Sequence, residues 1–165
     1  MTNPILEKDF VQIVKTLKKA TKLKELILEF SGGHDIGKQN YATTFLKFPM
    51  LLFMNHLKPL TRLTLYFKRS SGIFFSVNAF QRLMNLVSMM PSLENLSLEV
   101  ILNPNETRIP LDQSIFAKSM SSLTKLKVLR LLIHNISLEP TQYCQLWESI
   151  KSLKCLQFVL LNFPA

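Results

Sequence analysis

A repeated pattern of leucines constrains this chain more than any other feature of its sequence. Five segments share the form L-x-x-L-x-L-x-φ, where φ is apolar, and the last of them has Val in place of the second Leu. These segments are residues 23–30, 60–67, 93–100, 126–133 and 156–163. Their first residues are 37, 33, 33 and 30 positions apart. Such spacing is typical of a protein built from stacked repeats.

A second apolar pattern precedes each of these core segments. Apolar residues stand ten, nine, six and three positions before every leading Leu. These offsets fall on one stripe of a helix, whereas the apolar positions inside each core alternate as in a strand with one buried face. Each repeat is therefore predicted to be a helix, a tight corner and a short strand. Stacking such units predicts a parallel sheet backed by helices, in which each unit buries its apolar face, including the helix stripe, on its neighbours.

The L-x-x-L-x-L core resembles the leucine-rich repeat, and units of about 30 residues with a full helix resemble its ribonuclease-inhibitor-like class. The resemblance runs from Phe10 to Phe163 and implies an open α/β solenoid, with the parallel sheet on the concave side and the helices on the convex side. The family usually has Asn or Cys just after the strand. At the matching position this chain has Ser31, Lys68, Ile101 and His134. We therefore expect no asparagine ladder, and irregular turns after the strands.

The segments between each strand and the next helix absorb the variation in repeat length. They contain turn residues such as Gly32-Gly33 and Asn103-Pro104, but none is long enough to link two domains. Residues 1–165 are therefore predicted to form a single domain. The chain shows no signal-peptide order and no apolar run of the roughly 20 residues that span a bilayer. A cytoplasmic location is the default expectation, with an organellar or cytoskeletal assembly left open.

A search for catalytic or metal-binding patterns finds none that predicts an activity. His34, His56 and His134 fall in different repeats, without a carboxylate or cysteine at ligand spacing. The chain has no glycine-rich phosphate loop and no nucleophile motif. Cys144 and Cys155 are expected to be reduced, partly buried thiols. The sequence therefore predicts neither an enzyme nor a metal site or cofactor.

The solvent-facing strand positions of such a solenoid are the usual binding surface. They lie two, four and six residues after each leading Leu. The predicted partner-binding residues are Arg62, Tyr66, Val128, Arg130, Leu132, Phe158, Leu160 and Asn162. The remaining outward positions are Glu25, Ile27, Glu29, Thr64, Asn95, Ser97 and Glu99. The apolar residues of the last two strands should form one patch beside Arg130, and aromatic residues with arginine are typical interface anchors.

The C-terminal end of the repeat array is predicted to be an uncovered apolar edge. The sequence ends two residues after the fifth core, and no polar cap follows that core. An apolar edge strand is an aggregation hazard, and repeat arrays usually end in a polar cap. We therefore expect that a partner covers this end or that the chain is a piece of something larger, with simple exposure to solvent as the alternative.

The basic charge of the chain is concentrated in its N-terminal half. The net charge is +9, with 13 Lys/Arg against 5 Asp/Glu in residues 1–82 and 7 against 6 in residues 83–165. Lys15, Lys18, Lys19 and Lys22 share one stripe of the first predicted helix. This stripe is a weak candidate site for an acidic protein tail, a phosphate backbone or an anionic membrane face. Nucleic acid is disfavoured, because no aromatic residues are interleaved with the lysines.

Two functions follow from these features. The favoured one is a non-catalytic protein–protein interaction module, a scaffold or accessory subunit that docks in a larger assembly and binds a partner whose acidic surface would complement the basic N-terminal half. The alternative is a basic adaptor that binds nucleic acid or another polyanion through the lysine stripe. Substrate recognition in a ubiquitin-ligase-type complex rests on analogy with other ribonuclease-inhibitor-like repeats alone, since no ligase-contacting motif is visible.

Overall fold

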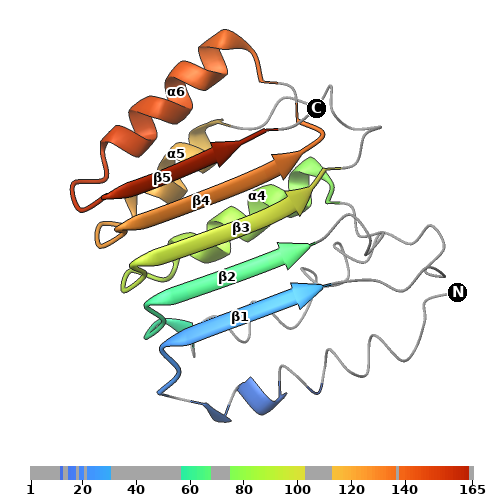
Figure 1. Cartoon of the computed structure of the whole chain (residues 1–165), viewed down its shortest axis with the longest axis vertical. Helices are drawn as coiled ribbons and strands as arrows, with labels where there is room; N and C mark the ends of the chain where they lie inside the picture. Colours follow the sequence, from blue (N-terminus) through green and yellow to red (C-terminus); the bar gives the residue numbers. More distant parts are fainter. Residues whose placement is uncertain are drawn as a thin grey trace, which may run out of the picture.

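The computed structural model describes residues 12, 15–17, 19–20, 22–30, 57–67, 75–102, 113–136 and 138–163. Within these residues the chain has an α/β architecture, with one parallel five-stranded sheet in the order β1-β2-β3-β4-β5 (Figure 1). The strands are β1 (Glu25–Phe30), β2 (Arg62–Phe67), β3 (Asn95–Ile101), β4 (Val128–His134) and β5 (Phe158–Asn162). Every strand lies inside one of the predicted repeat cores or extends it by one residue, so the parallel sheet is confirmed.

The register of the sheet follows the repeat in the sequence. Glu25, Arg62, Asn95, Val128 and Phe158 are paired from strand to strand, and each stands two residues after the leading Leu of its repeat. A slip by one residue would turn every apolar strand residue to the opposite face of the sheet. The alternating leucines therefore fix the register as well as the strands.

The described helices cover one face of the sheet (Figure 1). They are α4 (Val77–Ser88), α5 (Gln113–Ser121) and α6 (Pro140–Lys151), and each precedes a strand of its own repeat. The Ser76 side chain caps α4 by accepting the Ala79 N–H at 3.0 Å. At the start of α6, the Glu139 N–H donates to the Gln142 side-chain oxygen at 2.8 Å. Such caps bond main-chain groups that a helix terminus leaves unpaired, so local sequence sets where these helices begin.

The core lies between the helices and the sheet. In β3, Leu96, Leu98 and Val100 point into it and are fully buried. In the third repeat, all four predicted helix-stripe positions are also buried, namely Leu83, Met84, Val87 and Met90. The sequence pattern thus predicted the buried residues of both the strand and the helix of this repeat.

One predicted core residue lies at the surface. Trp147 occupies in α6 the repeat position that Met84 occupies in α4, yet 46% of its surface is exposed against 1% for Met84. The physical reason is position in the array, because α4 is followed by α5 whereas no described helix follows α6 (Figure 1). The prediction that this position is buried is therefore wrong for the last repeat.

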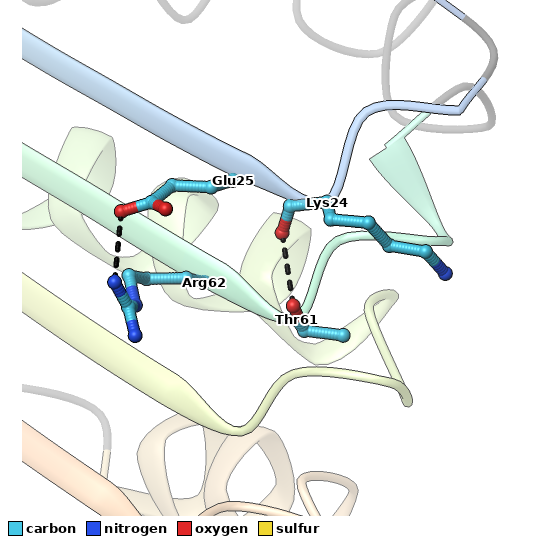
Figure 2. Close-up of polar contacts among 4 residues, drawn as sticks. All are labelled: Lys24, Glu25, Thr61 and Arg62. Atoms are coloured by element: carbon cyan, nitrogen blue, oxygen red, sulfur yellow. Dashed lines mark hydrogen bonds and ion pairs between the residues drawn. The ribbon is translucent and has the colours of Figure 1, made fainter.

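Neighbouring repeats share one main-chain junction. The Lys24 carbonyl accepts the N–H groups of Thr61 and Arg62 at 2.8 and 3.0 Å. The carbonyls of Thr61, Glu94 and Lys127 accept two N–H groups from the next repeat in the same way. Side chains reinforce the first junction, where the Thr61 hydroxyl donates to the Lys24 carbonyl at 3.1 Å and Arg62 pairs with Glu25 (Figure 2). These bonds satisfy backbone polar groups at each corner before a strand.

A single asparagine links two of the turns after the strands. The Asn135 side chain donates to the Leu102 carbonyl of the preceding repeat at 3.0 Å. Asn135 has a φ of 58°, the left-handed region that Asn tolerates better than most residues. This is a single bond of the kind that an asparagine ladder repeats, so the expectation that the chain has no such ladder stays a prediction. Asn135 stands one position after His134, the residue at the position that the family pattern gives to Asn or Cys.

A further side-chain pair links the third and fourth repeats. Because one of its members is a carboxylate, its contribution to stability depends on pH. Lys127 Nζ lies 2.7 Å from Glu94 Oε2, and this hydrogen bond, with the attraction between the two charges, lowers the pKa of Glu94 below its ordinary 4.5. The pKa of Glu94 is lower in the folded chain than in the unfolded chain. The pair therefore stabilises the fold at neutral pH, and this contribution is lost as the pH falls below 4.5.

Replacing Lys127 should therefore change how Glu94 titrates. In Lys127→Met, we expect the pKa of Glu94 to rise toward 4.5, measured by NMR titration of its side-chain carboxyl group. The matched control is Lys151→Met, which removes the partner of Glu148 and should leave Glu94 unchanged. A Glu94 pKa that is identical in the wild-type chain and in Lys127→Met would contradict the pairing.

Candidate partner-binding surface

Six of the eight predicted partner-binding residues lie together on two neighbouring strands. The register pairs Val128 with Phe158, Arg130 with Leu160, and Leu132 with Asn162. All six are at outward strand positions, on the face of the sheet that turns away from the helices, which we call the strand face. The two-residue period of a strand places these side chains on one side of β4 and β5.

Arg130 lies at the centre of this group and stacks on an aromatic ring. Its guanidinium carbon is 5.2 Å from the centre of the Phe158 ring, a cation–π contact. Phe158 and Leu160 are 44% and 43% exposed, and Val128 and Leu132 are half-buried. A flat guanidinium held against a ring loses less side-chain entropy on binding than a free one. These five residues form a contiguous, partly preorganised surface, which we call the β4–β5 patch.

Arg62 and Tyr66 lie apart from this patch. Both are on β2, and β3 separates that strand from β4. Arg62 Nη1 is 3.1 Å from Glu25 Oε1, and both side chains are about half exposed (Figure 2). Tyr66 is half-buried, and the register places it between Glu29 and Glu99. The N-terminal part of the strand face is thus mostly charged and polar, as the sequence predicts, with Ile27 of β1 as an exposed apolar residue.

Two outward positions are buried, contrary to expectation. Thr64 and Ser97 are paired in register at the middle of the strand face, yet only 8% and 6% of their surfaces are exposed. Strands lie about 4.8 Å apart, so small side chains are covered by larger neighbours on either side. In this row the neighbours are Ile27 and Arg130. The centre of the strand face, between its polar part and the β4–β5 patch, therefore has buried side chains.

Sequence reasoning missed a side-chain pair at the rim of the strand face. His134 ends β4, and its Nε2 atom lies 3.5 Å from Glu99 Oε1 on β3. Both side chains are about one quarter exposed. His134 was expected to be an ordinary surface residue, because residues 35 positions apart give no signal of contact until the register is known. The pair is a structural contact between repeats at this rim.

The lysine stripe is described only in part. Lys15, Lys19 and Lys22 are exposed, whereas Lys18 lies outside the described residues. The described part of this stripe holds its side chains in solvent, which agrees with the predicted polar side of the first helix. The histidines His34 and His56 also lie outside the described residues.

Among the described residues, no three His, Cys, Asp or Glu side chains come close enough to hold a metal ion together. Cys144 and Cys155 are free and exposed rather than partly buried as expected. No described helix is both long and apolar enough to cross a membrane.

Comparison with known proteins identifies the fold. No family model and no curated protein matches the chain. Among solved structures, the C-terminal domain of a Caenorhabditis elegans tropomodulin is similar, with a TM-score of 0.52 and 14% sequence identity. The match covers 91% of this chain and 83% of that one. That domain has a leucine-rich-repeat-like fold, and the parallel five-stranded sheet with helices described above is compatible with it.

Proposed function

We propose that this protein is a non-catalytic protein–protein interaction module, a scaffold or accessory subunit of a larger assembly. In this proposal the chain is an open solenoid of the ribonuclease-inhibitor-like class and the strand face is its concave side. Support comes from the five repeats, the strand order and the tropomodulin-like fold. A cytoplasmic location, free or within such an assembly, belongs to the same proposal.

The β4–β5 patch is the observation that carries this function. It combines two exposed apolar side chains with a guanidinium stacked on one of them. Interface hot spots are enriched in aromatic residues and Arg, and they cluster where water is excluded. The patch therefore suits a protein partner that offers an apolar side chain for Leu160 and Leu132 and a carboxylate for Arg130. Partner binding would also explain why these apolar side chains are exposed at the surface.

The second candidate function is polyanion binding through the lysine stripe. The exposed side chains of Lys15, Lys19 and Lys22 and the charge of the N-terminal half favour it. Binding to a polyanion releases counterions, so its affinity falls steeply as salt rises. Binding through the β4–β5 patch depends mainly on apolar burial and should change little with salt. Salt dependence therefore separates the two candidates.

Affinity capture of the full chain from its native source tests the proposal. The wild-type chain is washed at low and then at high salt and compared with Leu132→Glu, which places a charge in the β4–β5 patch. Met89→Glu is the matched control, because Met89 is 44% exposed but lies at the end of α4. We expect the wild-type chain and Met89→Glu to retain defined proteins through the high-salt wash, and Leu132→Glu to lose them. If only nucleic acid is captured and it leaves with salt, the lysine stripe becomes the binding site.

A further inference from the structure

The last repeat exposes side chains that the third repeat buries. Thirteen and nine residues before the leading Leu, α4 has Phe80 and Met84, which are 0% and 1% exposed. At the same two positions α6 has Tyr143 and Trp147, which are 38% and 46% exposed. Aromatic residues rather than polar ones thus occupy positions that would pack against a following helix. Tyr143 also contacts Phe163, with ring centres 6.0 Å apart, so the helix and strand layers meet at this edge.

Within the described residues, β5 has β4 on one side and no strand on the other, which we call its open edge (Figure 1). Phe158 donates its N–H to the Lys127 carbonyl, on the β4 side. Because successive main-chain groups of a strand point to opposite sides, the N–H and C=O groups of Val159 and Leu161 face the open edge. In addition, Gln157 stands at the position where Lys24, Thr61, Glu94 and Lys127 accept N–H groups from the next repeat. The edge is therefore built like the junctions inside the sheet.

Charge distinguishes this edge from the opposite one. β5 has no charged residue, whereas β1 has Glu25 and Glu29. Proteins usually protect exposed sheet edges with charges, and β5 lacks that protection. On α6, Glu148 and Lys151 neutralise each other at 2.7 Å. Residues 83–165 carry 7 Lys/Arg against 6 Asp/Glu, so most of the +9 charge lies at the other end of the array.

We propose that this end face, formed by Tyr143, Trp147 and the open edge of β5, binds a second copy of the chain in a two-fold dimer. A two-fold axis perpendicular to the sheet makes the two β5 strands antiparallel and brings the two α6 helices together on the same side of a continuous sheet. Such an interface is closed, because both copies contribute the same surface.

The residues of β5 are complementary to themselves in this arrangement. Around the axis, Leu160 of one copy lies opposite Leu160 of the other, and Phe158 lies opposite Asn162. Val159 then lies opposite Leu161, and these two residues exchange main-chain hydrogen bonds through the groups that face the edge. No like charges meet across the pair, and the basic N-terminal halves stay far apart. The absence of like charges on β5, compared with Glu25 and Glu29 on β1, therefore favours a second copy joined at this end over one joined at the β1 end.

The dimer shares Phe158 and Leu160 of β5 with the β4–β5 patch, but Tyr143 and Trp147 lie on α6, outside the strand face, so a substitution on α6 tests the dimer separately from the function proposed above. Sedimentation velocity of the full chain over a concentration series measures dimerisation. We expect a reversible monomer–dimer equilibrium, which Trp147→Glu weakens at least about tenfold, as for an anchor residue at an interface centre. Ile27→Glu, at an exposed apolar residue of β1, and Leu132→Glu, in the β4–β5 patch, should leave the dimerisation constant unchanged.

A second measurement keeps the test independent of how well the variant folds. In hydrogen exchange of the wild-type chain, the amides of Val159 and Leu161 should become protected as the concentration passes the dimerisation constant. A wild-type chain that stays monomeric at all concentrations overturns the proposal. So does a dimer or filament that Ile27→Glu weakens, because the β1 end would then take part. If the chain does not dimerise but captures a protein partner that Leu132→Glu loses, the dimer proposal is wrong and the proposed function is still supported.

Discussion

Leu98→Ala is expected to lower the free energy of unfolding by about 3 kcal/mol, the middle of the range for a leucine truncated in a packed core. Leu98 is on the central strand β3, five residues after its leading Leu, and is fully buried. It belongs to the hydrophobic cluster that joins the helices to the sheet. Because strands flank it on both sides, the surrounding structure has little freedom to collapse into the cavity.

The matched comparison is Leu161→Ala, which removes the same side chain at the same position of the last repeat. Leu161 is half-buried, since in the described part of the chain β4 is the one strand that neighbours β5. We expect a loss of about 1 kcal/mol when the protein is measured at high dilution, because less apolar area returns to water. Urea unfolding followed by circular dichroism gives both values. Equal losses for the two variants would contradict the description of β5 as a half-covered edge strand.

Arg130→Glu is expected to weaken binding of the protein partner at least about 100-fold, the effect of replacing an arginine hot spot with the opposite charge. Three contributions add up in this variant. The cation–π contact with Phe158 is lost, the carboxylate of the partner loses its cation, and two like charges are brought together. Titration of the purified partner by isothermal calorimetry measures the change.

Two controls separate charge from shape in this experiment. Arg130→Lys keeps the charge but loses the flat guanidinium, so it should bind with an intermediate affinity. Arg62→Glu makes the same charge change on β2, outside the β4–β5 patch, and should weaken binding by less than about threefold, as expected for a residue at the rim. If Arg62→Glu is as harmful as Arg130→Glu, the whole strand face binds the partner and the patch has no special role.

The strands and their register were predictable because each repeat encodes them separately. The alternation of leucines marks the buried face of every strand, and equal offsets in successive repeats place Val128 beside Phe158. The helix stripe was equally informative within the array, where Met84 is buried as predicted. A pattern that recurs in five repeats is more reliable than the same pattern in one segment, because a chance match rarely occurs five times.

The remaining features depend on neighbours that a repeat pattern does not contain. Trp147 matches the core pattern but is exposed, because burial at that position needs a following helix. Thr64 and Ser97 match the outward pattern but are covered by larger side chains of adjacent strands. The stacking of Arg130 on Phe158 joins residues 28 positions apart, and only the register shows that they meet. Our proposals rest on three of these residues, namely Trp147, Arg130 and Phe158.

Hydrogen exchange of the chain with and without its purified protein partner tests the central proposal most directly. If the β4–β5 patch is the binding site, β4 (residues 128–134) and β5 (residues 158–162) should exchange more slowly in the complex, whereas the lysine stripe (residues 15–22) should not change. If residues 15–22 are protected and both strands exchange as in the free chain, the patch is not the binding site and the proposal is wrong.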